Sequence, residues 1–119
     1  MVTHDNLSKE QFEIAAGKVG KNIMSYLPEM ISFKKRIQVE VLDIATRKEL
    51  ENVRDSIYTQ SLVDKLVNLA ARMWGNKAHF TSLYCAAMAV GTIIKEYEWG
   101  SKWITPNGLY ELANHIANE

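Results

Sequence analysis

The sequence predicts an all-α fold, a compact bundle of five or six helices in which residues 1–119 form a single helical domain. Apolar side chains recur at three- and four-residue steps along most of the chain, as they do on the buried face of a helix. Helix start signals precede three of these stretches. A length of 119 residues suits one domain that buries its core without a disulfide or a metal.

The first helix is expected to begin after Ser8. Ser8 is placed as the N-cap, and Gln11 is placed to reach back to it. The apolar residues that follow share one helix face: Phe12, Ala16, Val19, Ile23 and Leu27. Pro28 ends this helix or opens the next one, because proline cannot donate a hydrogen bond in a helix interior but fits a first turn.

Residues 28–45 permit two interpretations. A helical stripe runs through Met30, Phe33, Ile37, Val41 and Ile44. Within residues 36–44, however, Ile37, Val39 and Val41 alternate with polar neighbours, which is typical of a half-buried strand. We favour the helix because no hairpin partner lies nearby, and the strand stays open as the alternative.

A capping box at Thr46–Glu49 opens the next segment, and Thr59–Ser61 is expected to interrupt it. The helix that follows carries its apolar side chains at Leu62, Leu66, Leu69 and Met73. Gly75-Asn76 ends that helix, because glycine readily adopts the left-handed conformation of a helix C-cap. A further helix is expected over about residues 78–94.

The fold prediction allows one short β-hairpin near residues 95–104, where Gly100-Ser101 fits a two-residue type II′ turn. Thr105 and Pro106 then mark a helix start, with an N-cap followed by proline in the first turn. The buried face of this last helix is expected at Leu109, Leu112, Ala113 and Ile116.

Composition restricts the classes of function. The 14 basic and 14 acidic side chains cancel, which argues mildly against a dedicated binder of phosphate backbones. Cys85 is the only cysteine, and its apolar neighbours predict a small buried side chain in a reducing compartment. The first residues show no secretory pattern, and the apolar window at residues 83–94 is too short to span a bilayer, which predicts a cytoplasmic location.

The histidines show no metal-ligand spacing. His4, His79 and His115 are far apart, and we find no second His, Cys or carboxylate at metal-ligand spacing from any of them. We therefore expect no metal, no cofactor and no catalytic site.

Two pairs of small residues lie one helical turn apart, Ala16 with Gly20 and Ala87 with Gly91. Such pairs let two helix backbones approach closely. Glycine costs about 1 kcal/mol in a helix relative to alanine, so a close contact is expected to compensate. Each pair predicts either an internal helix crossing or the seam of a homodimer.

A candidate protein-interaction surface combines the only run of three like charges with an aromatic group: Lys34, Lys35, Arg36, Tyr97, Trp99 and Trp103. The basic run either contacts an acidic partner or phosphate, or is a solvated helix face. The aromatic residues form either an exposed patch of the kind found at binding hot spots or the roof of the core.

Residues 61–105 offer a second possible interface. A helix, the turn at Gly75 and another helix have the spacing of a helix-turn-helix, with candidate nucleic-acid contacts at Arg72, Lys77, His79 and Thr81. Followed by a hairpin and another helix, this order resembles a winged-helix domain, and the resemblance implies DNA binding. The expected recognition helix is apolar in its second half and the expected wing is acidic, which departs from the pattern.

Two hypotheses of function follow. The first is a non-enzymatic small helical binding module, which acts as an adaptor, small subunit or inhibitor of a larger macromolecule. Its partner would be another protein or complex, or a second copy of the chain, and not a membrane. The alternative is a winged-helix-like, DNA-binding transcriptional regulator. A small enzyme assembled from scattered residues such as His79, Glu96 and Tyr97 is a distant third.

Overall fold

The computed structural model describes residues 8–44, 56–75, 79–96 and 101–118, and the elements in these ranges are all helical. They are α1 (Lys9–Lys21), α2 (Ile23–Ile44), α4 (Ser56–Trp74), α5 (Phe80–Glu96) and α6 (Pro106–Asn118), with a short 3₁₀ helix, η2 (Ser101–Ile104), between α5 and α6. The described residues thus confirm the all-α prediction, with five α-helices. The second predicted capping box, at Thr46–Glu49, lies outside the described residues.

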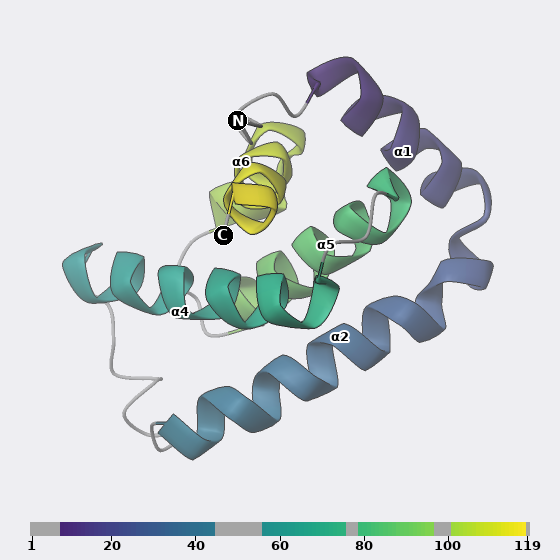
Figure 1. Cartoon of the computed structure of the whole chain (residues 1–119). Helices are drawn as coiled ribbons and strands as arrows, with labels where there is room; N and C mark the ends of the chain where they lie inside the picture. Colours follow the sequence, from purple (N-terminus) through teal and green to yellow (C-terminus); the bar gives the residue numbers. More distant parts are fainter. Residues whose placement is uncertain (1–7, 45–55, 76–78, 97–100, 119) are drawn as a thin grey trace.

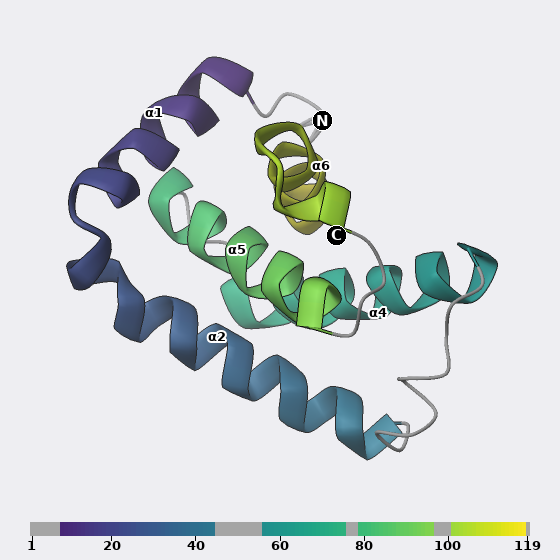
Figure 2. The same ribbon diagram turned by 180° about the vertical axis from the view of Figure 1, so that it is seen from behind.

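Helix α5 is the centre of the bundle. It packs against α1, α2, α4, α6 and η2, and the two opposite views show these elements around it (Figures 1 and 2). Its sequence explains this position, because a helix that is apolar around most of its circumference is stable only when other elements cover it. The buried side of α5 takes in Leu83, Cys85, Ala86, Ala87, Ala89, Val90, Gly91, Ile93 and Ile94.

Three predicted helix ends are confirmed by their local contacts. The Ser8 hydroxyl accepts a hydrogen bond from the backbone N–H of Gln11 at 3.3 Å, as an N-cap does. The Thr105 hydroxyl accepts one from the backbone N–H of Gly108 at 3.1 Å at the start of α6. Gly75 follows α4 with φ of 67°, the left-handed conformation expected at a helix C-terminus.

Two predicted helix boundaries are wrong. The break after the first helix falls at Asn22, whose backbone N–H is shared between the carbonyls of Lys18 and Val19 at 3.2 Å. Pro28 lies inside α2 as its sixth residue, where it removes one hydrogen-bond donor without ending the helix. The predicted break at Thr59–Ser61 is absent, since α4 runs unbroken from Ser56 to Trp74. Packing of the apolar helix faces on α5 outweighs these local signals.

Residues 36–44 belong to α2, which confirms the helical interpretation over the strand. The burial pattern agrees, because Ile37 is fully buried whereas Val39 is 61% exposed. In a strand these two side chains would share one face. In a helix they point about 160° apart, calculated at 100° per residue.

The predicted hairpin near residues 95–104 is wrong for the residues that the structure describes. Lys95 and Glu96 complete α5, and Ser101–Ile104 form η2. Trp103 explains why these residues form a helical turn and not a strand, because its side chain is only 5% exposed and belongs to the hydrophobic core. A compact helical turn allows this side chain to pack inward beside α5 and α6, which a hairpin extending away from the bundle would not.

Candidate functional site

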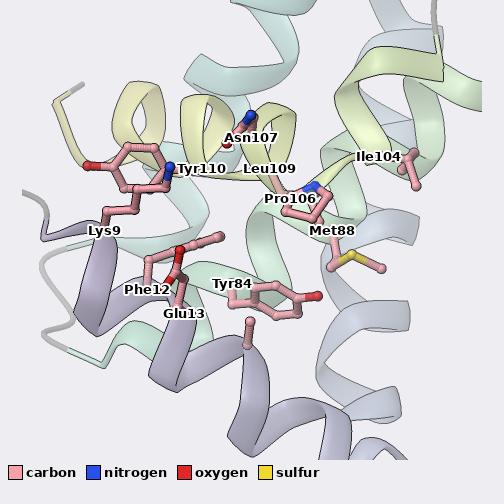
Figure 3. Close-up of a pocket in the computed structure, with 11 residues that line it drawn as sticks. Lys9, Phe12, Glu13, Tyr84, Met88, Ile104, Pro106, Asn107, Leu109 and Tyr110 are labelled. Atoms are coloured by element: carbon pink, nitrogen blue, oxygen red, sulfur yellow. The ribbon is translucent and has the colours of Figure 1, made fainter.

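An open cleft of about 330 Å³ lies where α1 and α6 diverge over α5 (Figure 3). Most of its surface is apolar and aromatic, and its lining comes from Lys9, Phe12, Glu13, Ala16, Tyr84, Met88, Ile104, Pro106, Asn107, Leu109 and Tyr110. Binding pockets are concave, mostly apolar and edged by a few polar groups, and this volume is at the small end of their range. The cleft is therefore the candidate functional site.

Three aromatic rings meet in this cleft. The Phe12 ring lies 5.4 Å from that of Tyr84 and 5.6 Å from that of Tyr110, centroid to centroid, at interplanar angles of 52° and 65°. Phe12 is only 3% exposed and belongs to the core, so the partly exposed rings of Tyr84 and Tyr110 are the ones that can meet a further aromatic group. Each of the three rings comes from a different helix, so the bundle itself assembles the cluster.

Tyr84 also brings a polar atom to the apolar wall. Burial raises the pKa of its hydroxyl, and the neighbouring Cys85 thiol raises it further. The phenol is thus neutral at physiological pH and can donate a hydrogen bond. No hydrogen-bond partner for this hydroxyl is found in the part of the chain that the structure describes.

Charged and polar side chains occupy the rim of the cleft. Lys9 and Glu13 are exposed one turn apart on α1, and Asn107 is exposed at the start of α6. Lys9 and Tyr110 lie toward one end of the cleft, and Ile104 lies toward the other (Figure 3). The charges of Lys9 and Glu13 cancel, so the rim favours an uncharged occupant over an ion.

The two small-residue pairs have different environments. At Gly91 an added Cβ would lie 2.9 Å from Cδ1 of Ile104 and 3.2 Å from the Trp103 carbonyl oxygen, so this position is an internal close approach. At Gly20 an added Cβ meets no other atom within 4 Å, and the residue is exposed. Ala16 lines the cleft, where its small side chain leaves room. Ala87, the other member of the Gly91 pair, is fully buried.

The predicted basic and aromatic surface is not a single patch. Lys34 forms an ion pair with Glu96 on α5, and the Gln38 side chain donates a hydrogen bond to the other oxygen of that carboxylate at 3.2 Å. Lys35 and Arg36 are exposed on α2. Trp103 is buried and is therefore part of the core, while Tyr97 and Trp99 lie outside the described residues.

Helix α2 also exposes apolar side chains that the sequence interpretation passed over. Four exposed apolar residues and one lysine share a strip that we call the outer face of α2: Met24, Pro28, Ile31, Lys35 and Val39. A signal for it was present, because these residues repeat at four- and three-residue steps beside the core stripe. The cleft had no such signal, because its aromatic residues are distant in sequence.

The predicted nucleic-acid contacts lie around the α4–α5 connection. Arg72 is exposed near the end of α4, while His79 and Thr81 lie at the start of α5. Lys77 lies outside the described residues. The second helix of a helix-turn-helix needs a free face to enter the major groove. In α5, only Lys95 and Glu96 at the C-terminal end are exposed.

No catalytic or metal-binding constellation is found among the described side chains. Burial raises the pKa of the Cys85 thiol to about 12, with a smaller contribution from Glu29, so this thiol is not an activated nucleophile. His79 precedes α5 and Glu96 ends it, which puts them about 25 Å apart along the helix at 1.5 Å per residue. The described residues hold no group of three potential metal ligands, and none of their helices is long and apolar enough to cross a membrane.

Comparisons of the chain with protein families, with curated proteins and with solved structures find no match.

Proposed function

We propose that the chain is a non-enzymatic binding module that holds an apolar anchor side chain of a partner protein in the cleft between α1 and α6. One observation carries the proposal: an open, aromatic cleft with a neutral polar rim. Buried aromatic anchors supply much of the binding energy of protein interfaces. A tryptophan or a similar side chain would place its ring against Tyr84 and Tyr110, above the buried Phe12.

The size and chemistry of the cleft favour an anchor over a substrate or cofactor. Its volume of about 330 Å³ accommodates one large side chain with its flanking backbone, and is small for a nucleotide-sized ligand. General acid–base chemistry needs titratable groups directed at one reacting atom. Lys9 and Glu13 instead lie at the rim, on the exposed side of α1. Asn107 and the Tyr84 hydroxyl are available to bind the backbone amide groups that accompany an anchor.

The DNA-binding alternative has less support. A winged-helix protein presents its second helix to the groove, and α5 instead packs against four other α-helices. The equal numbers of acidic and basic side chains also provide no excess positive charge to attract phosphate. We therefore place DNA binding second to protein binding.

A titration with N-acetyl-tryptophanamide, a neutral mimic of a tryptophan anchor, tests the cleft directly. In ¹H–¹⁵N spectra of the whole chain we expect saturable shifts at Ala16, Tyr84 and Tyr110, with a dissociation constant on the order of 1 mM for so small a probe. Ala16→Leu should weaken this binding about tenfold or more, because the larger side chain extends into the cleft.

Gly17→Leu is the matched control. It adds a leucine at the next residue, where an added Cβ meets nothing within 4 Å. Its binding should equal that of the unaltered protein. Shifts that do not saturate, or equal binding by the Ala16→Leu protein, would contradict the proposed site.

A further inference from the structure

The hydroxyl of Tyr84 is the polar group that α5 contributes to the lining of the cleft. It differs from the rim groups Lys9, Glu13 and Asn107, which are exposed, because Tyr84 is only partly exposed. Among the described residues this hydroxyl has no hydrogen-bond partner. Water must therefore satisfy it while the cleft is open.

The ring of Tyr84 is held in place by its neighbours. Phe12 packs against it at 5.4 Å between ring centroids and at an interplanar angle of 52°, and Phe12 is itself only 3% exposed. In Figure 3 the Tyr84 hydroxyl points toward the end of the cleft with Met88 and away from Tyr110. An aromatic anchor that lies against Tyr84 and Tyr110 would therefore have this hydroxyl at the edge of its ring.

An anchor that fills the cleft displaces water from the Tyr84 hydroxyl, which then depends on the polar atoms that the anchor itself carries. Phenylalanine and the aliphatic side chains carry none, so they would leave the hydroxyl without a partner, which is unfavourable. Tryptophan carries one N–H donor on a large apolar ring, and a hydroxyl oxygen accepts such a donor. A site that satisfies its polar group with one side chain and not with another discriminates between them.

We propose that Tyr84 selects tryptophan as the anchor side chain, by accepting a hydrogen bond from its indole N–H. The inference rests on the proposed function, because it needs an anchor in the cleft. It adds the chemical feature that the cleft would recognise besides apolar area, namely an aromatic ring with one donor at its edge. Tyr84 is then a specificity-determining residue, whereas the buried ring of Phe12 supports it from below.

Two other groups of the cleft fit this role less well. The Glu13 carboxylate is exposed on α1, where water competes for it. The Tyr110 hydroxyl points away from the other labelled side chains in Figure 3. Substitution of each group separates its contribution from that of Tyr84.

Two matched probes isolate the indole N–H. N-acetyl-tryptophanamide is compared with N-acetyl-3-(3-benzothienyl)alaninamide, in which sulfur replaces the N–H in a ring of nearly the same shape. Both probes carry the same backbone amides, so a difference in affinity belongs to the ring. In ¹H–¹⁵N titrations of the whole chain we expect the tryptophan probe to bind about three- to tenfold more tightly, which is the effect of one hydrogen bond between neutral groups.

Tyr84→Phe removes the hydroxyl and keeps the ring that packs against Phe12. It should weaken the tryptophan probe to about the affinity of the sulfur probe, and it should leave the affinity of the sulfur probe unchanged. Tyr110→Phe is the matched control, because it removes a hydroxyl from the other partly exposed ring of the cleft. The preference for the tryptophan probe should persist in that variant.

Equal binding of the two probes by the unaltered protein would overturn the inference, and would leave the hydroxyl to the backbone amides of the anchor. A preference that persists in Tyr84→Phe would also overturn it, and its loss in Glu13→Ala would then assign the N–H to that carboxylate. In each of these cases saturable binding at the cleft still supports the proposed function. If neither probe binds saturably, the proposed function fails and this inference fails with it.

Discussion

Glycines within helices have opposite roles at two positions of this chain. Gly91 is buried where α5 meets η2 and α6, and a Cβ there would lie 3.2 Å from a backbone carbonyl oxygen, which cannot move as freely as a side chain. Gly17 is exposed on α1 with nothing near it. The same substitution should therefore change stability in opposite directions.

Gly91→Ala is expected to destabilise the fold by about 1–3 kcal/mol, because overpacking outweighs the gain in helix propensity. Gly17→Ala should stabilise it by about 0.5–1 kcal/mol, because propensity acts there alone. Urea denaturation of both variants provides the measurement. A Gly91→Ala protein as stable as Gly17→Ala would show that α5 and η2 are not in close contact.

Cys85 makes stability depend on pH at the alkaline end. Burial holds the pKa of the folded thiol at about 12 against an ordinary value of 9.0, so above pH 9 the unfolded chain releases a proton that the folded chain retains. Stability contributed by the protonated thiol is thus complete below pH 9 and decreases as pH rises toward 12.

Denaturation at pH 8 and pH 10 should show a loss of stability that is smaller in Cys85→Ala. If Cys85→Ala loses as much stability between pH 8 and pH 10 as the unaltered protein, groups other than Cys85 cause the pH dependence. Iodoacetamide at pH 8 should likewise modify Cys85 far more slowly in the folded protein than in urea, since the side chain is fully buried and burial disfavours the reactive thiolate.

At the scale of the element, helix caps stabilise α1 and α6 at their starts. The Thr105 hydroxyl accepts the N–H of Gly108, which has no acceptor within the helix. Thr105→Ala should lower the free energy of unfolding by about 1 kcal/mol, and Thr105→Ser should recover most of it. Thermal denaturation of the three proteins is the check, and an unaffected Thr105→Ala protein would rule out a significant cap.

Local chemistry explains which elements the sequence could predict. The helix-end residues Ser8, Gly75 and Thr105 act on backbone groups within four residues of themselves. Their roles as helix caps could therefore be predicted from the sequence, and the structure confirms them. Pro28 was misplaced because its effect depends on the packing of α2 along α5. The hairpin was wrong because Trp103 gains more from burial in the core than from a strand pair.

The candidate site was only partly predictable for the same reason. The basic run on α2 could be predicted because its three residues are consecutive in the sequence. The ion pair of Lys34 with Glu96 could not be predicted, because these residues are 62 positions apart. The cleft depends on three rings from separate helices and on the angle between α1 and α6. Only the folded arrangement brings Phe12, Tyr84 and Tyr110 together.

At the scale of the whole molecule, the central helix α5 is covered by its neighbours, so the surrounding helices form most of the described surface. α1 and α6 border the cleft, and α2 packs along α5 as a separate helix (Figure 1). A chain of 119 residues can thus expose two surfaces of different chemistry, one mainly aromatic and the other mainly aliphatic.

Quantitative affinity capture from the native cell tests this account most directly, with the unaltered chain and two variants as bait. Proteins held through the cleft should be lost with Ala16→Leu and retained with Gly17→Leu. If the unaltered chain and both variants capture the same proteins in the same amounts, the cleft is not a binding site and the account is contradicted.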